Sequence, residues 1–269
     1  MNLAILLSSL LVLLNIASAE QQSLILATTT STDNSGLLQT ILPDFEERYG
    51  VDVDVIAVGT GAALRLGANG DADVVLVHAP SAERVYIEEG AYVNWRYLMY
   101  NDFVLLGPSS DPAAIANSSS VAEALNAIAV SDLSFISRGD DSGTHKKELA
   151  LWQAANVSPP SNYLEIGQGM GAALLMASET QAYVLSDRGT YLSMRGQLEL
   201  SVLYAGDDAM FNPYHIMAVN PNEHPGVNYM AAMMLIAYLS TPEVQERIGN
   251  FTIADEVLFF PAANTIPFE

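Results

Sequence analysis

Hydrophobic and polar positions follow two periods along most of this chain. Residues 51–58 (VDVDVIAV) alternate with period two, which predicts a half-buried strand, and the short apolar run 73–78 predicts a buried one. Residues 36–49 repeat their apolar positions with the period of a helix, in which Pro43 predicts a kink or a restart. Because segments of the two kinds alternate from residue 23 to residue 249, the pattern predicts an α/β fold with mostly parallel sheets.

The same pattern predicts where each element lies. Strands are expected at 23–29, 51–58, 73–78, 97–106, 133–136, 181–185, 201–204 and 215–219. Helices are expected at 36–49, 62–68, 81–89, 121–129, 146–156, 170–178, 190–195 and 228–239, with a further helix from residue 242. Parallel α/β sheets bind ligands at the carboxyl ends of their strands, so we expect the site at turns from strand to helix.

The N-terminus has the pattern of an export signal. Residues 3–16 form an almost unbroken apolar run, and Ala17-Ser18-Ala19 and the polar Glu20 follow it. This predicts a signal peptide at residues 1–19 and a protein exported to the periplasm or the cell surface. No Lys or Arg precedes the apolar run, so an uncleaved membrane anchor stays open as the alternative.

Composition excludes several classes of function. The chain has no cysteine, which excludes disulfides, thiolate nucleophiles and cysteine-based metal sites. Asp and Glu total 31 against 10 Lys and Arg, and the net charge of −21 argues against nucleic acid and anionic membranes as partners. The long-range field repels anions as well, so any anion site must be built locally.

Two turns from strand to helix carry the strongest candidate chemistry. Residues 28–32 (TTTST) place five hydroxyls at the start of a predicted helix, whereas ordinary capping needs one. Residues 137–144 (SRGDDSGT) hold Arg138, which can bind two oxygens of an anion with its guanidinium. The alternative for Arg138 is an ion pair with Asp140 or Asp141.

Two further turns are weaker candidates. Gly59-Thr60-Gly61 joins a predicted strand to a helix, and glycine lets a backbone approach a ligand closely, although a plain tight turn is the alternative. Residues 167–172 (GQGMGA) do not have the spacing of the dinucleotide fingerprint, and we interpret them as a close-packed turn lining the cleft.

These turns together predict an anion site on an acidic protein. Each helix N-terminus contributes roughly half an elementary charge and ready N–H donors. Three such termini and Arg138 supply about +2.5 locally, which balances a dianion. Hydroxyl and backbone N–H donors suit a ligand whose oxygens only accept hydrogen bonds.

Four motifs resemble those of the tungstate-binding proteins of Tup-type ABC importers. They are TTTSTxxSGLL at 28–38, VGTG at 58–61, SRGDxSGTH at 137–145 and YVLSDRGTY at 183–191, and the resemblance runs from about residue 23 to 261. It implies the type II periplasmic-binding-protein fold, in which two α/β lobes hold the ligand between them. We expect lobe I at 20–104 and 208–269 and lobe II at 105–207, with crossings near Val104 and Asp207.

The resemblance also implies the ligand and the partners. The residues implied to surround the anion are Thr30, Ser31, Thr60, Arg138, Ser142, Gly143 and Thr144. The ligand is expected to be tungstate, with molybdate as an alternative, and neither a cofactor nor a metal cation is expected. An ABC permease and its ATPase are the implied partners of a protein that we expect to be a monomer.

Other functions remain open at this point. The spacing from Arg138 to Thr144 also resembles phosphate-binding proteins of ABC importers, and phosphate near neutral pH keeps a proton that calls for a carboxylate acceptor. The orientation of Asp140 therefore bears on the choice. We expect no enzyme, because the four histidines form no metal pattern and Ser142 is not in a G-x-S-x-G elbow. A surface interaction protein, which would show no ligand-dependent stabilisation, is a remote alternative.

Overall fold

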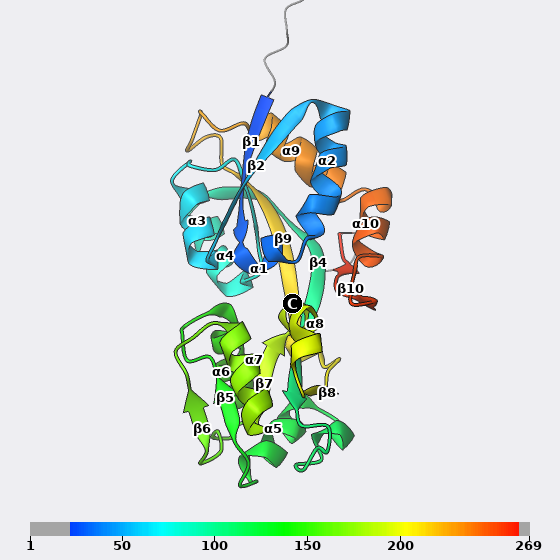
Figure 1. The fold of residues 1–269 in the computed structure, drawn as a ribbon. Coiled ribbons are helices and arrows are strands. Elements are labelled where there is room, and N and C mark those ends of the chain that lie inside the picture. The colour runs from blue at the N-terminus through cyan, green and yellow to red at the C-terminus, as the bar shows by residue number, and fades with distance from the viewer. Residues whose placement is uncertain (1–21, 264–269) are drawn as a thin grey trace, which may run out of the picture.

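The computed structural model describes residues 22–263, so the predicted signal peptide lies outside the described residues. Strands form two groups, one above the other in Figure 1, and two long strands run between them. The strands pair in the order β2-β1-β3-β9-β4-β7-β5-β6. Helices flank both groups, which confirms the predicted α/β fold.

The upper group is built from the N-terminal segment and from the C-terminal segment. The N-terminal segment contributes β1 (Gln22–Thr29), α1 (Thr30–Asn34), α2 (Leu37–Tyr49), β2 (Val51–Val58), α3 (Thr60–Ala68), β3 (Val74–Val77) and α4 (Pro80–Glu88). The C-terminal segment contributes α9 (Tyr229–Leu239), α10 (Pro242–Gly249), β10 (Thr252–Ile253), β11 (Glu256–Val257) and β12 (Phe260–Pro261). The helix through Pro43 is continuous and does not restart.

The lower group comes from the middle of the chain. It contains α5 (Val121–Ala129), β5 (Phe135–Ser137), α6 (Gly143–Ala154), β6 (Tyr163–Glu165), α7 (Met170–Thr180), β7 (Tyr183–Asp187), α8 (Arg188–Met194) and β8 (Ser201–Tyr204). Short 3₁₀ turns lie at Ile115–Asn117, Arg195–Gln197 and Asp208–Met210. The N-termini of α6 and α7 point toward the upper group, as those of α1 and α3 point toward the lower one (Figure 1).

Two strands connect the groups, β4 (Tyr92–Gly107) and β9 (Phe211–Val219). Within β4 the pairing partner changes between Asp102, which lies opposite Phe211 of β9, and Phe103, which lies opposite Asp187 of β7. Both pairings are antiparallel, as are those of β9 with β3 and of β8 with β4. The expectation of mostly parallel sheets is corrected here: the parallel pairs are β1 with β2 and β3, and β5 with β6 and β7, while the connecting strands make the sheet mixed.

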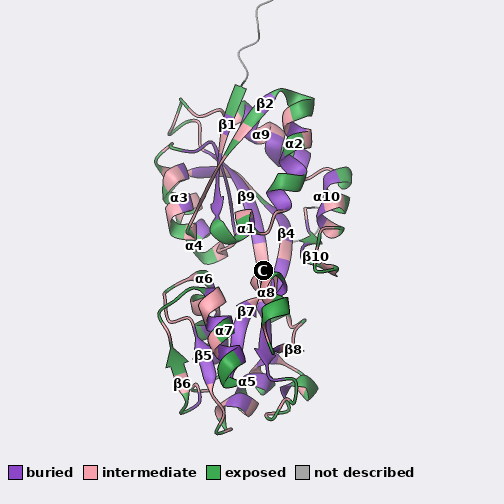
Figure 2. Ribbon diagram, in the orientation of Figure 1, coloured by how far each residue is buried: buried purple, intermediate pink, exposed green. Residues whose placement is uncertain are grey.

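Each group has its own buried core (Figure 2). In the upper group, α2, α9 and α10 cover one face of the strands, and Phe45 and Leu235 are fully buried there. The lower core includes Phe135, Trp152 and Tyr183. None of the helices within residues 22–263 is long and apolar enough to cross a membrane.

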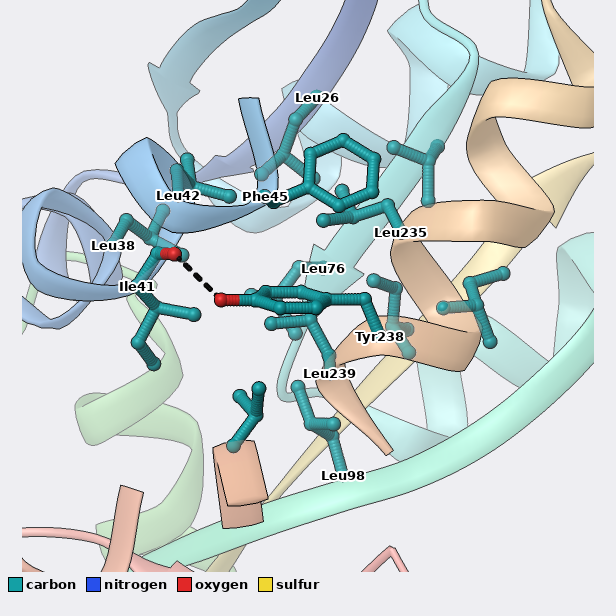
Figure 3. Packing of buried hydrophobic residues seen from close by; sticks show 14 of the residues in the cluster. Leu26, Leu38, Ile41, Leu42, Phe45, Leu76, Leu98, Leu235, Tyr238 and Leu239 are labelled. Carbon is teal, nitrogen blue, oxygen red and sulfur yellow. Dashed lines mark hydrogen bonds between the residues drawn. The ribbon is translucent and has the colours of Figure 1, made fainter. Parts of the chain in front are cut away.

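Tyr238 of α9 makes both an apolar contact and a polar contact with α2. Its ring lies against Phe45 with the centroids 5.4 Å apart, and its hydroxyl donates to the carbonyl of Ile41 at 3.1 Å (Figure 3). The same hydroxyl lies 2.8 Å from a carboxylate oxygen of Asp44. The apolar ring therefore stabilises the core, and the hydroxyl fixes the position of α2 over α9.

We expect Tyr238→Phe to lower the free energy of unfolding by about 1 kcal/mol, because it keeps the ring and removes one hydrogen-bonding group. Denaturant titration measures the change. Tyr49→Phe is the matched control, since Tyr49 packs on the same aromatic cluster but is exposed, and it should change stability less. Equal losses in the two variants would contradict a specific role for the Tyr238 hydroxyl.

Candidate functional site

A cavity of about 330 Å³ lies between the two groups of strands, and we call it the hydroxyl cavity. Thr30, Ser31, Asn34 and Ser35 of the first turn line it from the upper group, and Arg138, Met170, Gly171, Gly189, Thr190 and Ser193 line it from the lower group. Asn101 and Tyr214 line it from the connecting strands, together with Asp187 at the end of β7. Three of the predicted site residues, Thr30, Ser31 and Arg138, therefore share one cavity.

The hydroxyl-rich turn divides into structural and cavity-facing residues. The hydroxyl of Thr28 is buried and donates to the carbonyl of Leu76 at 2.7 Å. Thr29 caps α1 by accepting from the N–H of Thr32 at 3.2 Å, and the Thr32 side chain is itself buried. The remaining two, Thr30 and Ser31, are exposed and line the cavity. Capping explains part of the run, and two hydroxyls are left for a ligand.

Arg138 makes an ion pair and lines the cavity at the same time. Its Nε and one terminal nitrogen donate to the same oxygen of Asp140, at 3.1 and 2.5 Å. The other Asp140 oxygen accepts the N–H of Ser142 at 3.2 Å. Burial opposes ionisation of Asp140, but the hydrogen bonds from Ser142 and Arg138 keep its pKa below the usual value. Since arginine has five N–H donors, the guanidinium still has donors to offer a ligand.

The start of α6 lies beside a second cavity of about 550 Å³, which we call the aromatic cavity. Gly143 lines it together with aromatic side chains such as Trp95, Phe103 and Phe211. Ser142 caps α6 by accepting from the N–H of His145 at 3.2 Å, and its hydroxyl also hydrogen-bonds the Asp140 carboxylate. Thr60, Ser142 and Thr144 line neither of these two cavities, and the Thr144 side chain is buried.

Sequence reasoning missed several polar residues of this region. His78, directly after β3, contacts the first turn, and Asn212 of β9 contacts His78 at 3.0 Å. The position of His78 at the carboxyl end of a strand could have identified it. Asn101 and Asn212 lie inside antiparallel connecting strands, and no motif or turn marks them.

Asp187 is the carboxylate among the residues that line the hydroxyl cavity. It caps α8: one oxygen accepts the N–H of Thr190 at 2.8 Å, and the Thr190 hydroxyl lies 2.7 Å from the other. Next to it, Arg188 makes a two-point ion pair with Asp102 at 2.6 and 2.7 Å. Within residues 22–263, no group of three or more His, Asp or Glu side chains is arranged to hold a metal ion. Apart from Asp187, the polar lining of the hydroxyl cavity consists of hydroxyls, amides and one arginine, which suit an anion.

Comparison with known proteins adds the family. The sequence profile described as "PBP superfamily domain" matches residues 17–243. The "Tungstate-binding protein TupA" of Peptoclostridium acidaminophilum is 44% identical over 232 residues, which are 85% of this chain and 81% of that protein.

Two solved structures are similar as well. The tungstate-binding protein TupA from Desulfovibrio alaskensis G20 superposes with a TM-score of 0.85 at 41% identity, over 90% of this chain and all of that one. The tungstate ABC transporter structure from Geobacter sulfurreducens superposes with a TM-score of 0.77 at 52% identity, over 85% of this chain and 98% of that one. The chain therefore belongs to the periplasmic-binding-protein (PBP) superfamily and, within it, to the family of the TupA proteins.

Proposed function

We propose that this chain is an extracytoplasmic solute-binding protein that captures tungstate for an ABC importer. The observation that carries the proposal is the hydroxyl cavity, in which Thr30, Ser31 and Arg138 meet between the two groups of strands. Relatives that are 41 to 52% identical over most of both chains are named for tungstate. The relatives are named as tungstate-binding proteins or as a tungstate ABC transporter, so the chain is a binding protein and not an enzyme.

The proposed site combines both cavities. Thr30, Ser31 and Arg138 contact the anion from the hydroxyl cavity, and Gly143 offers its N–H at the start of α6. The hydroxyl cavity is larger than one tetrahedral anion needs, so closure of the two lobes over the ligand is expected, as in hinge-type binding proteins. In the closed form, Thr60, Ser142 and Thr144 complete the set of donors. The lobes in this proposal are 20–104 with 208–269, and 105–207.

Tungstate is favoured over phosphate by the state of Asp140. Tungstate is fully deprotonated near neutral pH and needs donors only, whereas phosphate keeps a proton that needs an acceptor. Asp140 lines neither cavity, and its carboxylate accepts hydrogen bonds from Arg138 and Ser142, so it does not face a ligand there as an acceptor. Asp187 is the remaining carboxylate at the cavity, and the Thr190 hydroxyl lies within hydrogen-bonding distance of both its oxygens. Molybdate has the same charge and shape as tungstate and is the second candidate ligand.

The transport role sets the rest of the proposal. The protein acts as an exported monomer in the periplasm or at the cell surface, and it delivers the anion to a permease with its ATPase. It needs no cofactor for this role. The signal at residues 1–19 directs export, by cleavage or as an anchor.

A thermal shift experiment with tungstate, molybdate, sulfate and phosphate tests the ligand. A ligand that binds only the folded state stabilises it by mass action, so tungstate at about a hundred times its Kd is expected to raise Tm by about 5 °C or more. Sulfate and phosphate are expected to have little effect. A shift with phosphate but not with tungstate would make this a phosphate-binding protein, and no shift with any of the four anions would overturn the binding function.

A further inference from the structure

His78 lies immediately behind the hydroxyls of the proposed site. Its Nε2 is 3.2 Å from the Thr29 hydroxyl oxygen and 3.4 Å from that of Ser31, which lines the hydroxyl cavity. We propose that His78 is the positioning residue of the anion site: it takes up a proton when the oxyanion binds, and the charged ring, acting through the Thr29–Ser31 hydroxyl cluster, turns the Ser31 hydroxyl into a donor toward the anion. This inference rests on the proposed function, because it needs an anion in the hydroxyl cavity.

The neighbours of the other ring nitrogen fix how the neutral ring is protonated. The amide nitrogen of Asn212 donates to Asn101 at 2.8 Å, so the amide oxygen of Asn212 faces Nδ1 of His78 at 3.0 Å. Nδ1 must therefore carry a proton and donate it. The ring also stacks on Tyr214, with the centroids 4.6 Å apart. In the neutral state, Nε2 has no proton and can only accept.

A neutral ring therefore competes with the anion for hydroxyl protons. Thr29, Ser31 and Thr32 form a compact hydroxyl cluster, in which the Thr29 oxygen lies 3.1 Å from that of Ser31 and 2.6 Å from that of Thr32. Each hydroxyl has one proton, and Nε2 draws one of them inward. Protonation reverses this bond, because Nε2–H then donates to the cluster. The hydroxyls then no longer donate to Nε2 and can donate to the anion instead. Hydrogen bonds linked in such a chain strengthen one another in a site of low dielectric.

The charge of the bound anion favours the same change. Without a ligand, desolvation keeps the pKa of His78 below its ordinary value, although the nearby Asp187 and Glu83 act in the opposite direction. A dianion at Ser31 adds negative charge close to the ring and raises this pKa. The other titratable or charged side chains near the ring line the two cavities: Arg138 and Tyr214 line the hydroxyl cavity, and the aromatic cavity is lined by Arg84, Tyr97, Lys146, Lys147, Asp208 and His215. Burial of the ring therefore explains why it needs a bound anion to become charged.

The sign of the pH dependence follows from this pKa. Because the pKa of His78 is higher in the complex than in the free protein, the complex holds more protons, and affinity rises as pH falls. The gain in affinity is complete below the pKa of His78 in the free protein. It is lost as the pH rises through the pKa of His78 in the complex. We therefore expect the affinity for tungstate to rise as the pH is lowered from about 8 toward about 6.

Calorimetry in buffers of different ionisation enthalpy measures the proton directly. At about pH 6.5 the wild-type protein is expected to take up protons from the buffer as it binds tungstate. His78→Gln, which keeps a hydrogen-bonding side chain but cannot be charged, is expected to bind tungstate with almost no proton uptake and a flat pH profile. The matched control is His224→Gln, whose imidazole contacts the Ala68 carbonyl at 2.8 Å outside both cavities, and it should behave as the wild type.

A second readout needs no variant to fold. NMR titration of the wild-type imidazoles is expected to show a higher pKa for His78 with tungstate than without it. Tungstate binding without proton uptake, or with unchanged uptake in His78→Gln, would overturn the role of His78 and leave the proposed function intact. Failure of the wild type to bind tungstate at all would overturn the proposed function itself.

Discussion

Replacing Arg138 by alanine is expected to lower the affinity for tungstate at least about a hundredfold. Arg138 is the arginine that lines the hydroxyl cavity, and its guanidinium is the donor best suited to bind two oxygens of the anion. The change also releases the Asp140 carboxylate, which Arg138 holds at 2.5 Å, so an unpaired negative charge is left beside the ligand. Calorimetric titration with tungstate measures the loss.

Two further variants serve as comparisons for Arg138→Ala. Arg138→Lys keeps the charge and loses the planar fork, so its affinity should fall between those of the wild type and Arg138→Ala. Arg48→Ala removes an arginine of α2 that pairs with Asp44 and Glu243 on the surface, and it should bind as the wild type does. Wild-type affinity in Arg138→Ala would remove Arg138 from the site.

The second large effect is expected where the chain crosses between the two groups of strands. Asp102 is buried at the point where β4 changes its partner, and it pairs with Arg188 at the start of α8. Asp102→Ala leaves the largely buried guanidinium without this partner, and it should lower the free energy of unfolding by about 3 kcal/mol. Glu256, whose carboxylate is 3.9 Å from Arg188, is too distant to replace both hydrogen bonds.

Denaturant titration measures the Asp102 effect against a surface pair. Glu243→Ala breaks the exposed ion pair with Arg48 and should leave stability nearly unchanged, because solvent screens such pairs. If Asp102→Ala were as stable as Glu243→Ala, the crossing would not depend on this ion pair. A double variant, Asp102→Ala with Arg188→Ala, should recover part of the loss, since no buried charge then lacks a partner.

Local sequence signals predicted the helices and most of the strands well. The helix at 121–129 and the strand at 201–204 have the predicted limits. The helix predicted from residue 242 begins there, after the Thr241 cap, whereas the helix predicted from residue 146 begins at Gly143, after the Ser142 cap. The connecting strands were predicted too short: β9 begins at Phe211 instead of 215, since Asn212 and Pro213 interrupt the apolar pattern while pairing with β4.

The candidate site likewise contains residues that a local rule predicts and contacts that no local rule predicts. Ser31 and Arg138 follow strands, so the rule for parallel sheets predicts both as site residues, and both line the hydroxyl cavity. The contacts of His78 with Asn212, and of Arg188 with Asp102, join residues more than 80 positions apart. Only the mixed sheet brings these pairs together, so no pattern in one segment could predict them. The hydrogen bonds that Asp140 accepts from Arg138 and Ser142 could not be predicted either, because they depend on the backbone conformation of residues 138–142.

The central claim is that tungstate binds between the two groups of strands, held by Thr30, Ser31 and Arg138. A crystal structure of the tungstate complex, with anomalous diffraction recorded at a tungsten absorption edge, tests it most directly. We expect one tungsten peak in the hydroxyl cavity, with the oxygens of the anion within hydrogen-bonding distance of Ser31 and Arg138. A tungsten peak outside that cavity, or none from crystals grown with excess tungstate, would contradict it.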